Sequence, residues 1–223
     1  MNFGYAPSIT AGFPELAAEA LLVSGIGRGM DVAGVVSDFT SMAARRLGAG
    51  TESDLPEIQA WRRAFAKMGL KPTQYRCASE ALLRRLRKEG ALPLIHPLVD
   101  LCNAVSLAFA IPVAAIDMAM MTGRLEVRHA TGTEAYEAFS GEIERPDPEE
   151  VIYADDGGHA HARRWTNRQS GRSAIRDTTT TALIVAEAMH GTARDDVAHL
   201  IDALAGALGE ARVRFVERRS FPG

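Results

Sequence analysis

Residues 97–128, PLVDLCNAVSLAFAIPVAAIDMAMMTGRLEVR, contain the change of pattern that decides the fold class. Pro97 suits the first turn of a helix, and the apolar run after it predicts a helix over residues 98–109. Pro112 prevents this helix from continuing. Residues 125–128 then alternate apolar and polar side chains, which is the period of a half-buried strand. The stretch therefore separates a helical part of the chain from a part built of strands.

Upstream of this stretch, the sequence predicts helices over residues 37–47 and 54–69, each with a residue suited to capping at its start and glycine at its end. Residues 74–89, QYRCASEALLRRLRKE, form the clearest predicted helix. Its last turns are cationic, as the helix dipole favours, and Gly90 ends it. Residues 15–26 are ambiguous, because they are Ala-rich enough for a helix but three glycines follow closely. Residues 32–36 form a short β-branched run.

Downstream, β-rich or alternating runs predict strands at 151–153, 159–162 and 178–185, then a helix at 192–208 and a strand at 212–216. Helices dominate residues 37–110 and strands 125–190, which predicts an α+β fold rather than a doubly wound sheet. We expect residues 1–223 to form a single domain. Its helix-rich half, about 37–110, and its strand-rich half, about 111–220, would share one core.

The composition is that of an ordinary globular protein. Of the 223 residues, 47% are hydrophobic and 24% charged, which excludes disorder, collagen-like fibres and disulfide-stapled mini-proteins. Cys77 and Cys102 lie in apolar contexts and predict reduced, packed thiols. No basic signal region precedes Arg28, and the apolar stretch 104–116 is shorter than the roughly 20 residues that span a bilayer. We expect a cytoplasmic protein without membrane association.

Charge is segregated along the chain, although its net value is only −3. An acidic stretch at 142–156 is followed by arginines with no acid before Asp177, namely Arg163, Arg164, Arg168, Arg172 and Arg176. Arginine suits bidentate contacts to phosphate or carboxylate, and the general preference for arginine over lysine also fits a GC-rich genome. Without a global cationic field, we expect no DNA binding.

Common catalytic signatures are missing from the sequence. It has no P-loop, no GxSxG elbow and no HExxH helix, and its cysteines lie too far apart for a Cys-type zinc site. His159 and His161 share one face of a predicted strand, where they either hold a metal together or face solvent. Since no ligand spacing supports the metal, we expect no metal and no cofactor. Any hydrolysis should therefore survive chelation.

Two stretches carry a resemblance. One joins Arg76-x-x-Ser-Glu-Ala-Leu-Leu-Arg84 to residues 92–106, LPLIHPLVDLCNAVS. The other joins residues 151–156, VIYADD, to residues 163–170, RRWTNRQS, and the run Thr178 to Thr181. Together they resemble the B3/B4 domain, the editing and tRNA-binding domain in the beta subunit of bacterial phenylalanyl-tRNA synthetase, and above all its freestanding single-domain relatives. The similarity runs from about residue 60 to 190.

The resemblance implies a β-sandwich-type core of unusual topology flanked by helices. It also implies association with tRNA and hydrolysis of wrongly attached amino acids from the tRNA 3′ end. One departure concerns the pocket. Where the family usually has Gly-Glu after the strand at 125–130, this chain reads Gly132-Thr133, with Glu134 one place later. Either Glu134 takes over the acidic role or the pocket recognises a different side chain.

Hydrolysis of an activated ester needs mainly a bound substrate, a positioned water and a stabilised oxyanion. Asn103 and Glu134 are the candidate catalytic pair, expected to face one cleft. Asn103 and Ser106 share a helix face, so they either line the amino-acid pocket or bond to neighbouring backbone. Asp117 either binds the substrate ammonium or closes an Asx-turn. Ser106, Asp117 and Thr178 are the candidate substrate-binding residues.

Trp165 stands among cations and an amide, the combination with which proteins stack unpaired bases and hold phosphates. The candidate tRNA-binding residues are Arg163, Arg164, Trp165, Asn167, Arg168 and Arg172. The alternative is a core tryptophan, with the arginines pairing the acids of residues 142–156.

We therefore predict an aminoacyl-tRNA deacylase that acts in trans on mischarged tRNA. The alternatives are a non-catalytic tRNA- or RNA-binding module and an amino-acid or other small-molecule binder, which the negative net charge favours.

Overall fold

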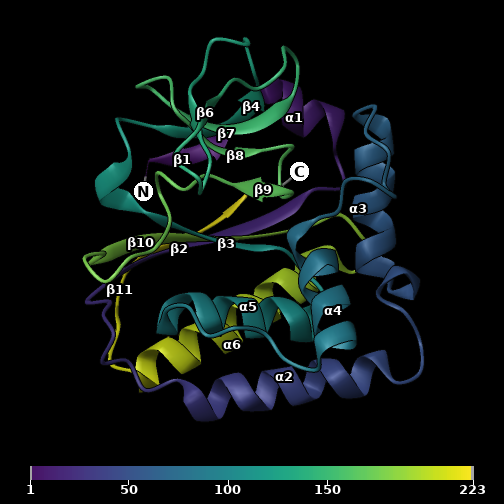
Figure 1. Ribbon diagram of the computed structural model, residues 1–223, viewed down its shortest axis with the longest axis vertical. Coiled ribbons are helices and arrows are strands. Elements are labelled where there is room, and N and C mark those ends of the chain that lie inside the picture. The colour runs from purple at the N-terminus through teal and green to yellow at the C-terminus, as the bar shows by residue number, and fades with distance from the viewer. Residues whose placement is uncertain (1, 222–223) are drawn as a thin grey trace.

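Two β-sheets lie face to face, and a layer of helices covers the outer side of one of them (Figure 1). The computed structural model describes residues 2–221. The five-stranded sheet has the order β1 (Phe3–Tyr5), β4 (Leu125–His129), β7 (Val151–Asp155), β8 (Ala160–Arg163), β9 (Arg168–Gln169). The four-stranded sheet has the order β11 (Arg214–Phe221), β2 (Ala17–Ser24), β10 (Thr181–Ala188), β3 (Val113–Asp117). The fold is α+β, as predicted.

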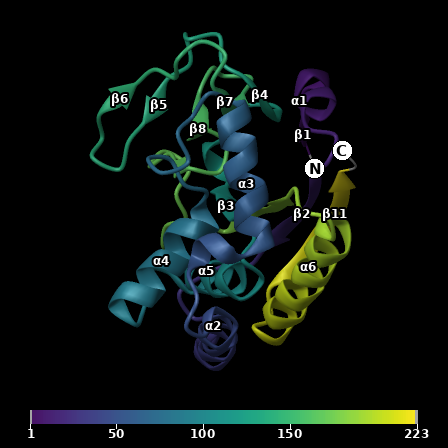
Figure 2. The ribbon, with the colours of Figure 1, turned by 90° about the vertical axis from the view of Figure 1, so that its right-hand side faces the viewer.

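Helices lie on the side of the four-stranded sheet away from the other sheet (Figures 1 and 2). Helices α5 (Pro97–Phe109) and α6 (Ala193–Glu210) pack on the sheet, and α2 (Ala33–Leu47) and α4 (Ala78–Glu89) pack against α5. Helix α3 (Pro56–Lys67) stands at the side of the stack, and the short α1 (Pro7–Gly12) follows β1. A two-stranded hairpin, β5 (Tyr136–Glu137) and β6 (Ile143–Glu144), projects from the body. Two 3₁₀ turns, η1 (Glu52–Asp54) and η2 (Met118–Met120), complete the elements.

Strand β10 lies between the two main hydrophobic cores, and its side chains point alternately into one and the other. Leu183 and Val185 belong to the core between the sheets, whereas Ile184 and Ala186 belong to the core under the helices. Successive side chains of a strand point to opposite faces, so a strand buried on both faces reads as a continuous apolar run. By the same parity, Glu187 points into the space between the sheets. Glu187 is the one charged residue in the strand sequence TALIVAEA.

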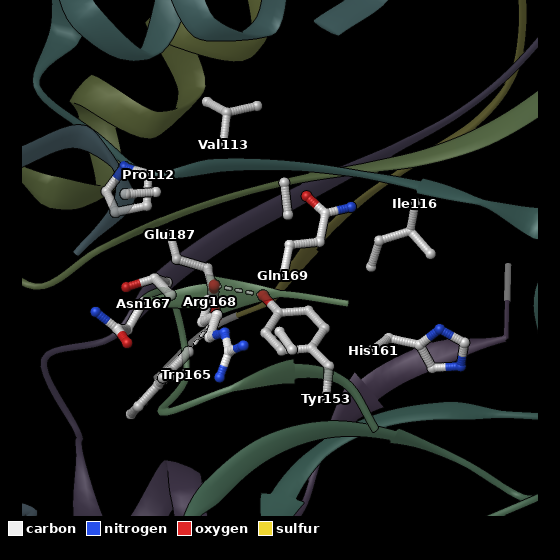
Figure 3. A pocket seen from close by; sticks show the side chains of 14 residues that line it. Pro112, Val113, Ile116, Tyr153, His161, Trp165, Asn167, Arg168, Gln169 and Glu187 are labelled. Atoms are coloured by element: carbon white, nitrogen blue, oxygen red, sulfur yellow. Dashed lines mark hydrogen bonds between the residues drawn. The ribbon is translucent and has the colours of Figure 1, made fainter. Parts of the chain in front are cut away.

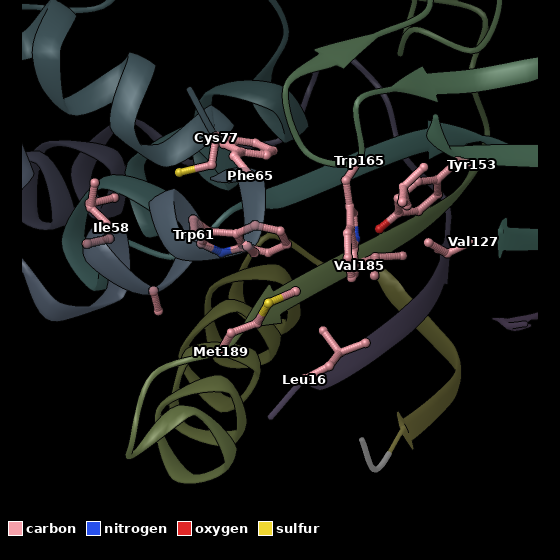
Figure 4. Packing of buried hydrophobic residues seen from close by; sticks show 14 of the residues in the cluster. Leu16, Ile58, Trp61, Phe65, Cys77, Val127, Tyr153, Trp165, Val185 and Met189 are labelled. Atoms are coloured by element: carbon pink, nitrogen blue, oxygen red, sulfur yellow. The ribbon is translucent and has the colours of Figure 1, made fainter. Parts of the chain in front are cut away.

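The core between the sheets is rich in aromatic side chains (Figure 4). The ring of Trp165 meets Trp61 edge-on at a centroid distance of 5.2 Å and Phe13 at 5.0 Å. Edge-to-face pairs of this kind add about 0.5–1.5 kcal/mol each to the stability gained by burial. The turn after β8 is therefore anchored in the core by its tryptophan.

Several sequence expectations need correction. Within the ambiguous residues 15–26, Ala17–Ser24 form strand β2, and the helix predicted from residue 37 begins at Ala33, inside the β-branched run 32–36. The strand predicted from residue 178 begins at Thr181, because residues 178–180 form a turn and its exit. The helix expected at 74–89 begins at Ala78.

Both cysteines are free and buried, and burial raises the pKa of each thiol to about 12. They are therefore protonated, unreactive parts of the core. Among residues 2–221, no helix is long and apolar enough to cross a membrane.

Candidate functional site

A cavity of about 70 Å³ lies between the two sheets, with Glu187 in its wall (Figure 3). Strand β3 supplies its apolar side, and the segment from β8 to β9 supplies most of its polar side. Its polar and aromatic lining residues are Tyr153, His161, Trp165, Thr166, Asn167, Arg168, Gln169 and Glu187. An apolar cavity with a few converging polar groups is the usual form of a small-molecule site.

The carboxylate of Glu187 is bound by three neutral donors from the facing elements. Oε1 accepts hydrogen bonds from the Tyr5 hydroxyl and from Trp165 Nε1, both at 2.7 Å. Oε2 accepts one from the Tyr153 hydroxyl. Among the described residues no cation forms an ion pair with Glu187, which is 1% exposed. The carboxyl group therefore links the two sheets through hydrogen bonds alone.

Burial raises the pKa of Glu187 above its ordinary value, and the three hydrogen bonds lower it only in part. Burial also raises the pKa of the Tyr5 and Tyr153 phenols well above 10, and the nearby Glu187 carboxylate raises both further. The tyrosines therefore stay protonated and donate to the carboxyl group. A buried acid with a raised pKa inside a cavity is a candidate proton acceptor in catalysis.

The turn between β8 and β9 has a strained backbone. Arg164 and Trp165 have φ values of 47° and 57°, the left-handed region that residues with a Cβ seldom adopt. Each such residue costs of order 1–3 kcal/mol unless its surroundings fix it. Here Trp165 N donates to Val151 O at 2.7 Å, and Ala78 N donates to Thr166 O at 2.8 Å. These hydrogen bonds and the burial of Trp165 hold the turn, and with it the polar side of the cavity, in this conformation.

A second pocket, of about 130 Å³, adjoins the cavity, since Val113 and Gln169 line both. Asn103 from α5 lines this outer pocket, and Phe139 of the β5–β6 hairpin stands at its edge with 74% of its surface exposed. Gln169 Nε2 donates to Ala115 O at 2.8 Å, which fixes the amide between the two spaces. Cavity and outer pocket together can hold a two-part ligand.

The structure separates the two predicted catalytic residues. Asn103 is half-buried in the outer pocket, and its side chain forms no hydrogen bond within the described chain. Glu134 lines neither the cavity nor the outer pocket. The expectation that both face one cleft is therefore corrected, and of the two only Asn103 keeps a place in the candidate site.

Glu134 instead closes the loop after β4. Its carboxylate accepts hydrogen bonds from the backbone N–H groups of Thr131 and Gly132 at 3.1 Å, and Arg128 donates to it at 2.6 Å. Gly132 has φ +86°, and a Cβ there would meet Pro148 at 3.0 Å. Burial favours a higher pKa for Glu134, but the Thr131 N–H and the Arg128 guanidinium outweigh it and lower the pKa to about 2.

Glu134 should therefore stabilise the fold at neutral pH. Because its folded pKa lies below its unfolded value, the stabilisation is complete above about pH 4.5 and is lost as the pH falls toward 2. We expect Glu134→Gln to lower the free energy of unfolding by about 2 kcal/mol at pH 7 and to have little effect near pH 2. Urea unfolding at several pH values measures this difference. Glu142→Gln, at an exposed position nearby, is the control; an equal loss in both variants would contradict the assignment.

Two of the three predicted substrate-binding side chains, Ser106 and Asp117, have structural partners. The Ser106 hydroxyl donates to Ile111 O at 2.6 Å. Asp117 accepts from Ala119 N at 2.9 Å and from the Thr179 hydroxyl at 2.6 Å, so it closes a turn, which was the alternative interpretation. Thr178 is exposed in the turn before β10, and the buried hydroxyl is that of Thr179. None of the three lines the cavity or the outer pocket.

The predicted tRNA-binding set is also corrected in part. Trp165 is 0% exposed, so its ring has no face available to a base. Arg163 is buried against Glu144 and Glu150, and Arg168 pairs with Glu144. These arginines neutralise the acidic stretch, as the alternative interpretation held.

The remaining members of that set are Arg164, Asn167 and Arg172, and Arg176 lies just beyond the set. Asn167 donates to Arg76 O at 2.7 Å, and Arg164 lies over the Tyr75 ring. Arg172 and Arg176 form no ion pair within the described residues, and they flank Ala174 and Ile175 of the outer pocket. Within the described residues no acid neutralises either arginine, and Arg176 Nη2 donates to Gly171 O at 2.8 Å.

His159 and His161 both approach Asp155, with nitrogen–oxygen distances of 3.3 and 3.2 Å. His161 is 0% exposed, so the expectation of two solvent-facing histidines is wrong for it. Burial lowers the pKa of His161, and the imidazole is therefore neutral near pH 7.

Comparison with known families gives a match over residues 60–204, to the model described as the B3/4 domain. The chain belongs to the B3/4 domain family. Every residue that lines the cavity, from Ala78 to Glu187 and including the β8–β9 turn, lies inside the matched range of this B3/4 domain. Comparison with curated proteins finds no match.

Among solved structures, the B3/4 domain is similar to an N-terminal fragment of the phenylalanyl-tRNA synthetase beta subunit from Pyrococcus horikoshii. The TM-score is 0.52 at 10% sequence identity, and the match covers 100% of this chain and 54% of that one. The chain thus spans about half the length of that structure. At this identity the likeness shows the fold alone.

Sequence reasoning missed Glu187, Tyr153 and Phe139 as residues of the candidate site. One signal was present: a lone acid near the end of the apolar strand run TALIVAEA, where a charge is costly unless it has a use or a partner. Phe139 gave no signal, because single exposed apolar residues are common on protein surfaces.

Proposed function

We propose that this B3/4 domain is an editing-type hydrolase, which removes amino acids from mischarged tRNA and acts in trans on tRNA charged by a separate synthetase. Family membership supports a role related to tRNA synthetases. The observation that carries the proposal is the pair of adjoining spaces with Gln169 on the wall of both. An aminoacyl-adenosine has the matching form, since one ester joins a small side-chain part to a nucleoside part.

In this proposal the amino-acid side chain enters the cavity between the sheets, and the terminal adenosine occupies the outer pocket. The cavity offers apolar walls from Val113 and Ile116 and polar groups from Gln169 and Glu187. In the outer pocket Phe139 presents a face on which an unpaired base stacks, and the Asn103 amide lies within the same space. The ester then lies near Gln169.

Four side chains serve the hydrolysis. The amide of Asn103, which has no partner within the described chain, donates to the ester carbonyl, where negative charge develops. Water adds to the ester carbonyl carbon and gives a proton to the ionised Glu187 carboxylate. The bond from that carbon to the ribose oxygen then breaks and the ribose oxygen takes the proton back, so a free amino acid and uncharged tRNA are released. Tyr153 and Trp165 hold the Glu187 carboxyl in place through their hydrogen bonds. This arrangement needs no covalent nucleophile.

Arg172 and Arg176 supply the phosphate contacts in this proposal. Each single-strand phosphate that a protein cation neutralises releases counterions, and it contributes about −0.7 to the slope of log affinity against log salt concentration. Replacing both arginines with alanine should therefore make the slope of tRNA binding less negative by about 1.4. Filter binding at several salt concentrations measures the slope. Arg194→Ala with Arg214→Ala, on α6 and β11, is the control pair, and an equal change there would place the RNA elsewhere.

The experiment that tests the function uses a panel of tRNAs, each charged with a correct or an incorrect amino acid. Loss of the ester is followed with the purified protein, with Asn103→Ala, and with no protein. Faster loss from one mischarged tRNA than from its correctly charged form is the expected result. No acceleration on any member of the panel would overturn the proposal.

A second function is favoured by one observation. The acids of residues 142–156 neutralise Arg163 and Arg168, and the net charge is −3, so the surface has little excess cation for RNA. The cavity alone would then bind a free amino acid. Calorimetry with the twenty amino acids, in the absence of tRNA, distinguishes this function, since the hydrolase needs the nucleoside part for tight binding.

A further inference from the structure

Three side chains that are distant in sequence meet where α3 and α6 begin. Glu57 is the second residue of α3, Asp196 lies in the first turn of α6, and His190 lies in the connection from β10 to α6. One potential ligand atom of each lies within 4.8 Å of those of the other two. Within residues 2–221 this is the one group of three such residues with that spacing.

Two of these side chains are buried and carry polar atoms without partners. Glu57 is 5% exposed and His190 is 8% exposed. Arg46 of α2 binds Glu57 Oε1, but Glu57 Oε2 has no hydrogen-bond partner, and neither has His190 Nδ1. Buried polar atoms are almost always satisfied, because leaving one unpaired costs about 1–3 kcal/mol. The unpaired oxygen of Glu57 therefore points to a ligand that the protein chain does not supply.

The third member completes a set suited to a metal ion. His190 Nε2 lies 2.7 Å from Asp196 Oδ2, and the Thr192 hydroxyl donates to the same oxygen. Two carboxylates beside a buried imidazole form a donor set of two oxygens and one nitrogen. Imidazole favours Zn²⁺ and its neighbours in the transition series, whereas Mg²⁺ and Ca²⁺ prefer oxygen alone.

We propose that Glu57, His190 and Asp196 bind one divalent transition-metal ion of the Zn²⁺ type, with water in the remaining position. Ligand atoms about 2.0–2.1 Å from a tetrahedral ion are about 3.4 Å apart. The separations present are at most 4.8 Å, so shifts of little more than 1 Å suffice: the wider separations shorten, and the 2.7 Å contact between His190 and Asp196 opens. Glu57 and His190 are fixed by the elements that carry them, and Asp196 is half-buried and able to adjust.

Arg46 sets the strength of this site. Its guanidinium pairs with Glu57, so it competes with a cation for the same carboxylate. With Arg46 in place we expect a moderate affinity for the metal ion. Arg46→Gln should raise that affinity, and it should lower the free energy of unfolding of the metal-free protein because the ion pair with Glu57 is lost. If these residues form only a network of ion pairs and bind no metal, Arg46→Gln should lower the free energy of unfolding without any gain in metal affinity.

The metal would also brace the cavity. Glu57 and Trp61 are one helical turn apart on α3, and Trp61 Nε1 donates to the backbone oxygen of Glu187 at 3.4 Å. His190 follows Glu187 by three residues. A metal bound between α3 and the end of β10 therefore holds the cavity wall from outside. Its role is structural, and the inference does not depend on the proposed hydrolysis.

The test is binding of Zn²⁺ to the chelator-stripped full chain. Calorimetry should give one Zn²⁺ per chain, and the melting temperature should rise by about 5–10 °C at a free Zn²⁺ concentration near 100 times the dissociation constant. Mg²⁺ at the same concentration should leave the melting temperature unchanged. Co²⁺ supplies a second readout, because its visible absorption band reports the coordination directly and does not depend on stability.

Variants distinguish the site from surface binding. His190→Gln and Asp196→Asn should abolish the Zn²⁺-induced shift and the Co²⁺ band while the metal-free protein still unfolds cooperatively. His199→Gln and Asp195→Asn, at exposed positions on the same helix, should keep both. If the wild type shows no Zn²⁺-dependent shift, or if the His199 and Asp195 variants lose it as well, the assignment is wrong.

Discussion

Glu187→Ala is expected to lower the free energy of unfolding by about 4 kcal/mol, the largest effect on stability of any single substitution considered for this protein. The change leaves the Tyr5 and Tyr153 hydroxyls and Trp165 Nε1 without their acceptor and opens a void between the sheets. Since domains are stable by only about 5–15 kcal/mol, a large part of the total is lost. Urea unfolding monitored by tryptophan fluorescence measures the change.

Glu187→Gln separates the hydrogen bonds from the charge. The amide keeps one oxygen for Tyr5 and Trp165, and the Tyr153 hydroxyl is able to accept from the new N–H group. We expect a loss of no more than about 1.5 kcal/mol. Equal losses for the alanine and glutamine variants would show that the carboxyl group is not held as described.

The Glu187 carboxyl group also makes the free energy of unfolding depend on pH. The folded pKa of Glu187 lies above its unfolded value, so its favourable contribution is complete below about pH 4.5 and is lost as the pH rises through the folded pKa. In Glu187→Gln this decline should disappear. The sign is opposite to that of Glu134, whose contribution is lost on acidification. Melting temperatures between pH 2 and pH 8 for the two glutamine variants resolve both effects.

Asn103→Ala is expected to reduce the rate of ester hydrolysis by about 100-fold or more, with a much smaller effect on substrate binding. A donor that acts on the developing oxyanion contributes mainly to the transition state, so kcat should fall while KM changes little. Single-turnover hydrolysis of the best mischarged tRNA measures the step. The protein should remain folded, because Asn103 has no side-chain partner within the described residues.

Ser41→Ala is the matched control for this prediction. Asn103 lines the outer pocket and also a groove between α2 and α5, whereas Ser41 lines only that groove. If Ser41→Ala lowers the rate as strongly as Asn103→Ala, the substrate lies in the groove and the arrangement proposed at Gln169 is wrong.

The sequence predicted the elements that have strong local signals. Helix α5 has the predicted beginning and end, because Pro97 fits only the first turn and Pro112 excludes continuation. Residues 15–26 could not be assigned, since their helix-forming alanines are overruled by pairing with β10 on one side and β11 on the other. Tertiary context decides such segments, and local propensity does not.

The candidate site was harder to predict, for a reason that the segment RRWTNRQS makes clear. Its composition is that of an RNA-binding loop, but two consecutive residues with positive φ turn Trp165 into the core. A turn of this kind without glycine has no signature in sequence. Asn103 was singled out because it lies in residues 92–106, one of the stretches that carry the family resemblance. Glu134 was misplaced because the acids that close a loop and the acids that bind a ligand are the same residue type.

The pairing of β2 with β10 and β11 has a consequence for synthesis of the protein. Ser24 pairs with Thr181 in β10 and with Arg214 in β11, so an early strand waits for partners that the ribosome makes late. At about 5–20 residues per second, the wait for β10 is about 8–30 s. During that time the apolar run Ala20 to Val23 has no partner strand, and exposed strands of this kind associate with other chains. The nascent chain is therefore a natural client for chaperones that shield extended hydrophobic segments.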